Sequence, residues 1–293
     1  MPCSGFEHEE RIRRGQFSTQ SIHDLKLWKV SVFGNCSNGG LCIIVTSLLT
    51  PDRGKQHEAS MDFSAFKMLT FDIVGTCIDF EKGVLDAVRR IGGSAAAHLS
   101  DDDIFGPYMA GRDLNYGRSS EVFADVYVHL AQELGLPTTP DAARDFQLSV
   151  LEWPAFAESV EALGRLRTRF RLVAMTNADR TAYSAYAHRL GLPFHDAVTC
   201  DEAQCAKPNP EFFAFNRGRQ SALGYKQSEI LHVAQSQHHD IGVAKSLGYK
   251  TCWIERRHDQ VGYGATPDPA SFTEPDLRLP SLKALADAVL GAA

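Results

Sequence analysis

The chain has 293 residues, 44% of them hydrophobic and 23% charged, with a formal net charge of −6. This composition is that of an ordinary folded protein, and the length suits one large domain or a core domain that carries a smaller one. A mildly acidic chain has no electrostatic footprint for nucleic acid and no polybasic patch for a membrane surface. The best apolar run, 41–49, is also well short of the roughly 20 residues of a membrane span. We therefore expect no nucleic-acid partner and no membrane partner.

The cysteines and the first residues indicate a cytoplasmic protein. There are seven cysteines, an odd number, and none is arranged as C-x-x-C. Reduced thiols in the cytoplasm are the simplest interpretation of such a set. The segment 7–10 is acidic, Glu-His-Glu-Glu, and lacks the basic character with which a signal peptide starts.

Residues 1–60 differ from the rest of the chain. They are rich in polar residues, with short apolar pieces and no sustained period, and Met61 follows them. We interpret this extension as a poorly ordered tail, or as upstream sequence included through a wrong start codon, because the fold is complete without it. The alternative is a targeting or docking arm.

From Lys67 onward, short apolar runs alternate with amphipathic segments of helix length. Asn209 and Pro210 form a good helix start, with Asn as the N-cap and Pro at the first helical position. Strands that alternate with helices predict an α/β fold with a doubly wound parallel sheet. The expected strands are 67–71, 171–175, 197–200, 230–234 and 250–255, and the helices between them include 179–191, 210–223 and 239–247.

Residues 84–165 break this alternation. They contain several helical segments, clearest over 121–134 and 156–166, and no convincing strand. A helical block between the first two strands of a parallel sheet indicates an inserted cap domain. We therefore expect an α/β core made of 61–83 and 166–293, with the cap over 84–165.

Polar residues follow the ends of the expected strands. Ligands bind beyond the carboxyl ends of the strands in an open parallel sheet. Each residue alone is a weak signal, because an Asp after a strand is usually a turn residue and a Lys before Pro-Asn-Pro is usually solvated. Their joint order is far more specific. In chain order they are Asp72 with Thr76, Thr176 with Asn177, Lys207 with Pro208, and Ser236 with Asp240.

In this order the motifs resemble those of the haloacid dehalogenase superfamily. The family's first motif is a strand, an Asp nucleophile and a nearby Gly-Thr, here Asp72-Ile-Val-Gly-Thr76. Its second is a Ser or Thr that closes a strand, here Thr176, and its third is a Lys commonly followed by Pro, here Lys207. Its fourth is a strand that runs into a loop with acidic residues, here 233–240. The resemblance implies a Rossmann-like hydrolase core, and the helical block lies where the family inserts its cap.

The resemblance covers about 67–256 and departs from the family's phosphatases at two places. Phosphatases carry a second Asp two residues after the nucleophile, which protonates the leaving alcohol, and here that residue is Val74. They also bind magnesium with an Asp early in the fourth motif, where this chain has Gln235 or Ser236, and magnesium sites normally use carboxylates. The family's dehalogenases need neither device, because halide leaves without a proton and the substrate is a monoanion. The capped L-2-haloacid dehalogenases also have a non-acidic residue at the first place and an Asn after the second motif, here Asn177.

By this resemblance, Asp72 displaces halide from carbon and forms an aspartyl ester, which water then hydrolyses. Lys207 pairs with Asp72 and keeps it ionised. Thr76 and Thr176 would donate hydrogen bonds to Asp72 or to the substrate carboxylate. Asn177 would bind the substrate and the departing halide. Asp240, with Ser236 close by, would position the hydrolytic water.

Two parts of the implied site match less well. The dehalogenases have a Ser-Ser-Asn-x-x-Asp pattern in the fourth motif, and here Gln235 and Gln237 replace its first Ser and its Asn. They also place a cap Arg beside the halide. Arg112 and Arg118 are substrate-binding candidates by composition, and a solvated arginine at a helix end is the alternative for each.

The pair His238-His239 does not indicate a metal site. Adjacent histidines at a helix start project in different directions and lack the i, i+4 spacing of two ligands on one face. We expect surface or loop-packing histidines.

The sequence therefore predicts a metal-independent hydrolytic dehalogenase of small 2-haloacids, with a small-molecule substrate and no cofactor. The alternative is a phosphatase or related phosphohydrolase with an altered magnesium site, which would use magnesium. A non-catalytic binding protein is disfavoured by the joint presence of the motif residues. Phosphonate cleavage is disfavoured because it needs a cap lysine, and none occurs between Lys82 and Lys207. Assembly as a homodimer is left open.

Overall fold

The computed structural model describes residues 31–35, 41–44, 61–115 and 117–292. The chain divides into two compact units, Met1–Glu58 and Ala59–Ala293. In the first unit, β1 (Ser31–Asn35) pairs antiparallel with β2 (Leu41–Ile44). Residues 1–60 are predicted to be a poorly ordered tail, and apart from β1 and β2 they lie outside the described residues.

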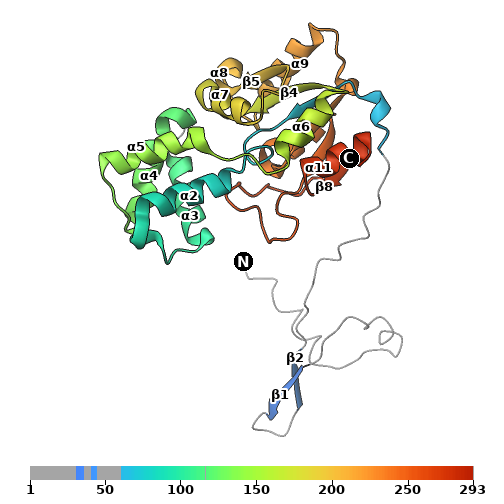
Figure 1. Ribbon diagram of the computed structural model, residues 1–293. Helices are drawn as coiled ribbons and strands as arrows, with labels where there is room; N and C mark the ends of the chain where they lie inside the picture. The colour runs from blue at the N-terminus through green and yellow to red at the C-terminus, as the bar shows by residue number, and fades with distance from the viewer. Residues whose placement is uncertain (1–30, 36–40, 45–60, 116, 293) are drawn as a thin grey trace, which may run out of the picture. The chain divides into compact units, whose positions relative to one another are not determined.

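The second unit is built on a parallel sheet of six strands in the order β5-β4-β3-β6-β7-β8. The first strand of this unit, β3, therefore lies in the middle of the sheet, and the chain winds outward from it in both directions (Figure 1). Such a reversal of strand order leaves a crevice at the carboxyl ends of the central strands. The strands are β3 (Met68–Phe71), β4 (Arg171–Thr176), β5 (Asp196–Thr199), β6 (Ile230–Ala234), β7 (Lys250–Ile254) and β8 (Leu277–Leu279).

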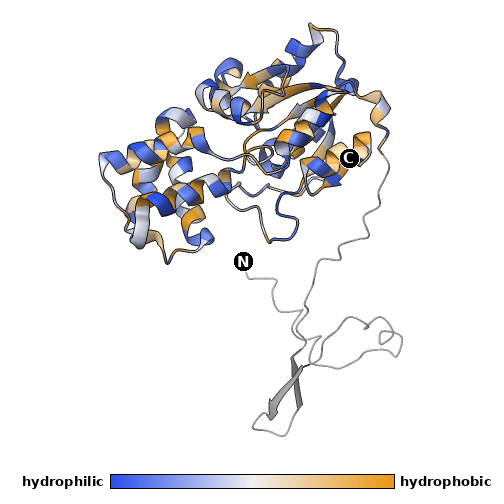
Figure 2. Ribbon diagram, viewed as in Figure 1, coloured by the Kyte–Doolittle hydropathy of each residue, from blue (hydrophilic) through white to orange (hydrophobic). Residues whose placement is uncertain are grey.

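The predicted doubly wound parallel sheet is confirmed, and each of the expected strands corresponds to a strand of the sheet within one or two residues. The edge strand β8 was not predicted. It has three residues, and its Leu-Arg-Leu sequence is only partly buried, so it gives no apolar run that distinguishes it from a loop. Figure 2 shows hydrophobic residues concentrated along the strands of the sheet.

Helices pack around the sheet and connect its strands. The helix predicted over 239–247 is a π-helical turn followed by a short α-helix, whereas those predicted over 179–191 and 210–223 are regular. In this part of the chain the helices are α6 (Ser159–Arg167), α7 (Arg180–Arg189), α8 (Cys200–Ala203), α9 (Pro210–Ser221), η6 (Gln237–Ile241), α10 (Gly242–Ser246) and α11 (Leu282–Leu290).

The helices between β3 and α6 form the cap, which lies to one side of the sheet in Figure 1. Two of its helices begin at good N-caps: Ser100 forms a capping box with Asp103, and Thr139 precedes Pro140 at the first helical position. Neighbouring helices α3 and α4, and α4 and α5, pack along one another. The cap helices are α2 (Phe80–Gly92), α3 (Asp101–Leu114), α4 (Ser119–Leu134) and α5 (Pro140–Ser149), with short 3₁₀ turns at Gly93–Ala96 and Val150–Glu152.

The sequence interpretation sets the end of the cap at residue 165, within α6. That helix packs mainly against α11 and also contacts β4, so its main contacts are with elements of the core. The reason is the hydrophobic face that α6 presents to the C-terminal helix, which periodicity alone could not assign to a partner. No helix of the described residues is long and apolar enough to cross a membrane.

The cap and the core are joined by one continuous apolar cluster. Trp153, at the end of the cap, stacks on Tyr186 of α7 with ring centroids 6.2 Å apart and contacts Phe80 at 6.1 Å. The two linkers between cap and core also pair with each other, because Ile78 forms an antiparallel bridge with Ala155. The cap is therefore held at a defined place above the carboxyl ends of the strands.

Candidate active site

Asp72 lies directly after β3, in the middle of the sheet. Its backbone N–H still donates to Val233 of β6 at 3.0 Å, so the strand pairing fixes its position. The chain then turns sharply at Gly75, where φ is +91° and a Cβ atom would lie 3.1 Å from Gln235 Oε1. This turn brings Thr76 back to Asp72, and its hydroxyl donates to Asp72 Oδ2 at 2.7 Å. The same hydroxyl accepts the N–H of Gln235 at 2.8 Å.

Lys207 is the cation at the centre of the site, and its residue is only 3% exposed. Its ammonium donates to Asp72 Oδ1 at 2.8 Å, to Asp240 Oδ1 at 2.7 Å and to the Met175 carbonyl at 2.8 Å. All three ammonium protons therefore have acceptors. Asn177 fixes the backbone of Lys207 on both sides, since its amide donates to the Lys207 carbonyl at 2.8 Å and accepts the Lys207 N–H at 2.7 Å.

The charges of this cluster are strongly coupled. Burial raises the pKa of Asp72 above its ordinary value, and Lys207 and Thr76 oppose that shift. Burial also acts against the charged form of Asp240, but Lys207 and His232 outweigh it and lower the pKa of Asp240 to about 2. The two carboxylates in turn outweigh the burial of the ammonium and raise the pKa of Lys207. Asp240 and Lys207 are thus charged at neutral pH, and the ionisation of Asp72 depends on the shared cation.

Asp240 lies in the turn η6, which Ser236 caps by accepting the N–H of His239 at 2.9 Å. Its Oδ1 accepts hydrogen bonds from Lys207 and, at 3.0 Å, from the ring of His232. Its Oδ2 is buried and has no hydrogen-bond partner among the described residues. One oxygen of this carboxylate is thus held by two donors, while the other has no donor among the described residues.

These residues lie at one side of a cavity of about 720 Å³ between the sheet and the cap. Of the residues that the sequence predicts for the site, two do not line it: Thr76 and Thr176 are fully buried behind the wall. The hydroxyl of Thr176 accepts the N–H of Ala178 at 3.1 Å and so shapes the turn that carries Asn177. The predicted residues that do line the cavity are Asp72, Asn177, Lys207, Ser236 and Asp240 from the core, and Arg112 and Arg118 from the cap.

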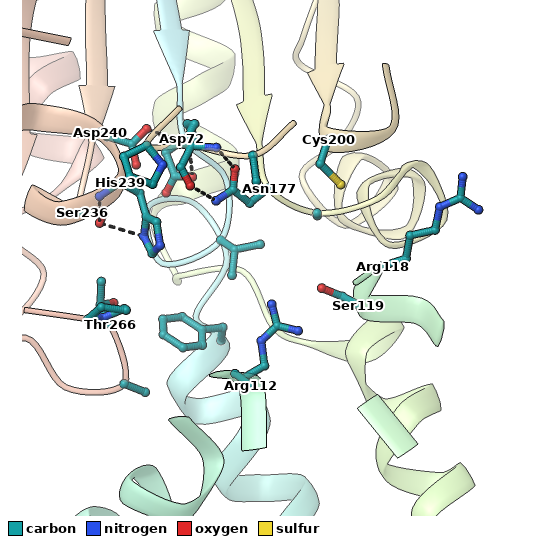
Figure 3. A pocket seen from close by; sticks show the side chains of 18 of the residues that line it. Asp72, Arg112, Arg118, Ser119, Asn177, Cys200, Ser236, His239, Asp240 and Thr266 are labelled. Carbon is teal, nitrogen blue, oxygen red and sulfur yellow. Dashed lines mark hydrogen bonds and ion pairs between the residues drawn. The ribbon is translucent and has the colours of Figure 1, made fainter. Parts of the chain in front are cut away.

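The two cap arginines differ in their surroundings. Arg112 stacks over Phe123, 4.8 Å from the ring centroid, and its Nη1 is buried without a hydrogen-bond partner among the described residues. The Arg118 side chain is 54% exposed and forms ion pairs with Asp201 at 2.7 Å and Glu121 at 3.1 Å. Figure 3 shows the Arg112 guanidinium directed toward the side of the cavity where Asp72 and Asn177 lie, and Arg118 directed away from it. Among the described residues that line the cavity, Arg112 therefore keeps a buried guanidinium donor without a protein partner.

Other lining residues are not among those that the sequence predicts for the site. His239 lines the cavity and packs in its turn against Ser236, with its ring Nδ1 3.1 Å from the Ser236 hydroxyl; burial lowers its pKa to about 4, and the ring is neutral at neutral pH. Its position one residue before Asp240 was the available signal. Phe80 and Trp153 contribute apolar wall, and Thr266 comes from the long connection between β7 and β8. No motif marks that connection.

Arg256 binds the turn that follows Asp72. It follows β7, and its guanidinium donates twice to the Thr76 carbonyl, at 3.1 Å from Nε and 2.6 Å from Nη2. It also pairs with Glu158 and stacks on Phe156, 3.8 Å from the ring centroid. One buried cation thus joins the turn after Asp72 to the linker through which the chain returns from the cap.

The donor set does not fit a magnesium ion. Both oxygens of Asp72 already accept hydrogen bonds from protein donors, and the Oδ1 of Asp240 is bound to Lys207. Gln235 or Ser236 occupies the place where the family's phosphatases have a further magnesium-binding carboxylate. Among the described residues, no group of three or more His, Cys, Asp or Glu side chains is placed to hold a metal.

Comparisons with known proteins agree with this geometry. A family model for haloacid dehalogenase-like hydrolases matches residues 66–248. Haloacetate dehalogenase H-2 of Moraxella sp. (strain B) is 28% identical over 173 residues, which are 58% of this chain and 72% of that protein. The structure of L-2-haloacid dehalogenase from Xanthobacter autotrophicus has a TM-score of 0.62 at 19% identity and covers 78% of this chain and 100% of that one. The putative hydrolase YfnB from Bacillus subtilis, solved with magnesium, has a TM-score of 0.60 at 19% identity and covers 76% of this chain and 98% of that one. At these identities the structural likeness shows the fold.

Proposed function

This chain belongs to the haloacid dehalogenase-like hydrolases, and on that premise we propose that it is a metal-independent hydrolytic dehalogenase of small 2-haloacids. The observation that carries the proposal is the ion pair between Asp72 and Lys207 at the floor of the cavity. In this chain Val74 stands at the place where a phosphatase has the acid that protonates the leaving alcohol. The likeness to a curated haloacetate dehalogenase supports the same substrate class.

In the first step, an Asp72 oxygen attacks the carbon that bears the halogen, and the carbon–halogen bond breaks as the ester bond forms. The halide leaves with the bonding electron pair, so no proton donor is needed. Lys207 keeps Asp72 ionised before attack. Each Asp72 oxygen has its own donor, Lys207 for Oδ1 and Thr76 for Oδ2. Whichever oxygen attacks, the other keeps a hydrogen bond.

In the second step, water adds to the Asp72 carboxyl carbon and passes a proton to Asp240. The remaining hydrogen bond to the ester carbonyl oxygen stabilises the negative charge that develops there. The bond between the carboxyl carbon and the esterified oxygen then breaks, and this oxygen leaves with the product as its hydroxyl group after taking up a proton. The products are halide, a 2-hydroxyacid and one proton.

We assign Arg112 to the substrate carboxylate or the departing halide, both of which are anions. Its buried Nη1 has no protein acceptor among the described residues, and a buried donor without a partner is costly until a ligand satisfies it. Asn177 is a further lining residue, although both ends of its amide are engaged with the Lys207 backbone. We therefore propose two roles for Asn177. Its main role is to hold Lys207 in place, and its second is to contact the halide.

Replacing Arg112 with methionine is expected to lower kcat/KM for 2-haloacids by about 10²-fold, as for the loss of one preorganised donor to a developing anion. Arg118→Gln is the matched control, because that side chain already pairs with Asp201 at the exposed edge of the cavity. It should change kcat/KM by no more than about threefold, the scale of an exposed ion pair. Equal losses in the two variants would remove Arg112 from this role. The measurement is halide release against substrate concentration.

The test of the proposed function compares two activities, each with and without a chelator. The expected result is halide release from 2-chloropropionate or 2-bromoacetate that a chelator leaves unchanged. The cavity is larger than a two-carbon acid requires, so the panel should include 2-haloacids with longer chains. Magnesium-dependent phosphate release from a monoester, together with no halide release, would instead establish the phosphohydrolase alternative. A solved structure of similar fold was determined with bound magnesium.

We also propose a cytoplasmic location. Cys77, Cys200, Cys205 and Cys252 are free thiols in the structure, as suits a reducing compartment. Alkylation of intact cells before lysis tests this, because thiols that are reduced in the cell are modified before any oxidation in the extract.

A further inference from the structure

A buried histidine lies below the catalytic cluster. His232 of β6 and Thr70 of β3 are register partners in adjacent strands, and both are fully buried. The Thr70 hydroxyl lies 2.9 Å from His232 Nδ1, and His232 Nε2 lies 3.0 Å from Asp240 Oδ1. A continuous line of hydrogen bonds therefore runs from the interior of the sheet to the carboxylate at the cavity.

The partners of the ring indicate its tautomer. Asp240 is ionised and can only accept, so Nε2 must carry the proton that it donates to Oδ1. Nδ1 is then an acceptor and takes the proton of the Thr70 hydroxyl. This arrangement satisfies both ring nitrogens of a neutral imidazole: Asp240, which can only accept, selects the tautomer, and the Thr70 hydroxyl holds the other ring nitrogen.

Packing alone does not require a histidine here. The ring lies against Phe213, with centroids 5.2 Å apart, inside an apolar layer, where an aliphatic side chain would avoid the cost of burying polar atoms. The polar ring instead supplies the second donor to one oxygen of Asp240. With Lys207 and His232 both on Oδ1, Oδ2 is the oxygen left without a partner among the described residues.

We propose that His232, oriented by Thr70, is a positioning residue that holds the Oδ2 atom of Asp240 toward the water that hydrolyses the Asp72 ester. The proposal rests on the proposed function. Esterification removes the charge of Asp72 and so changes the surroundings of Lys207, which touches both carboxylates. His232 does not contact Asp72, and its hold on Asp240 therefore persists when the ester is formed and hydrolysis begins.

The two chemical steps separate this role from a general structural one. His232→Leu should leave ester formation within about twofold of the native rate and slow ester hydrolysis by about 10²-fold, the lower end of a general-base contribution. Rapid-quench assays should then show a burst of about one halide per active site, followed by a slow steady rate. Intact-protein mass spectrometry should show the enzyme accumulating as the ester adduct.

Three further variants keep the test decisive if His232→Leu folds poorly. His232→Gln retains an N–H donor near the Nε2 position and should restore much of the hydrolysis rate. Thr70→Val removes the hydroxyl that holds the Nδ1 side of the His232 ring, at a residue that lies away from the cavity, and should give the same burst in weaker form. Phe213→Leu disturbs packing against the ring without touching Asp240, so it should lower the melting temperature and leave the ratio of burst to steady rate unchanged.

The proposal is overturned if His232→Leu and Thr70→Val turn over without a burst or adduct, or if both steps slow equally. It is also overturned if Phe213→Leu accumulates as much ester as they do. Failure of the proposed function itself looks different, because the native enzyme would then release no halide from any 2-haloacid of the panel.

Discussion

Replacing Asp72 with asparagine is expected to lower halide release by at least about 10⁴-fold, the scale seen when a covalent nucleophile is removed. The amide has nearly the same shape but cannot form the ester. Lys207 keeps its contacts with Asp240 and Met175, so the site retains a paired cation. The variant should therefore fold with a melting temperature equal to that of the native protein or higher, since it buries one ionised group fewer.

The measurement is the rate of halide release over a long incubation, with circular dichroism as the control for folding. A folded Asp72→Asn protein that retains more than about 1% of the native rate would contradict the nucleophile assignment. Slow recovery of activity during incubation has to be checked by peptide mass, because an asparagine that deamidates regenerates Asp72.

Replacing Lys207 with methionine is expected to lower halide release by about 10³-fold and to destabilise the fold by about 3–5 kcal/mol, because a buried ion pair loses one partner. Burial and the neighbouring Asp240 both raise the pKa of Asp72, and Lys207 is the main opposing influence. Without it the Asp72 carboxyl binds a proton at higher pH and loses its nucleophilicity.

The same change gives the stability of the variant a pH dependence of known sign. A carboxyl whose pKa is higher in the folded state than in the unfolded state favours folding at low pH, and this contribution is lost as pH rises through the folded-state pKa. The free energy of unfolding of Lys207→Met should therefore recover toward the native value on acidification. Urea unfolding at mildly acidic and at alkaline pH measures this, with Lys207→Arg as the charge-retaining control. If the loss of unfolding free energy in Lys207→Met, relative to the native protein, grew on acidification, the raised pKa of Asp72 in this variant would be contradicted.

The floor of the site could be predicted from the sequence because local rules fix it. A buried run that ends in Asp72, with a Gly-Thr after it, specifies a strand, a tight turn and a returning hydroxyl. Parallel strands place their carboxyl ends at one edge, so Lys207 and Asp240 are expected near Asp72 even though they are far away in the sequence.

The remaining features depend on packing that no motif records. His232 reads as one more residue of a buried strand, and its meaning comes from Thr70 in the neighbouring strand. Arg112 and Arg118 are alike in the sequence, and only their surroundings, Phe123 for the first and Asp201 for the second, separate them. The edge strand β8 is too short to show a period, and α6 could be assigned to the core only through its contact with α11.

The central claim is that Asp72 forms an ester that water hydrolyses at the enzyme's own carboxyl carbon. A single-turnover reaction in ¹⁸O-labelled water, with enzyme in excess over a 2-haloacid, tests this claim most directly. The account predicts that one labelled oxygen enters the peptide that contains Asp72 and that the 2-hydroxyacid product stays unlabelled, because its hydroxyl oxygen comes from the Asp72 carboxylate. Label in the product with none in that peptide would show direct attack by water and would contradict the account.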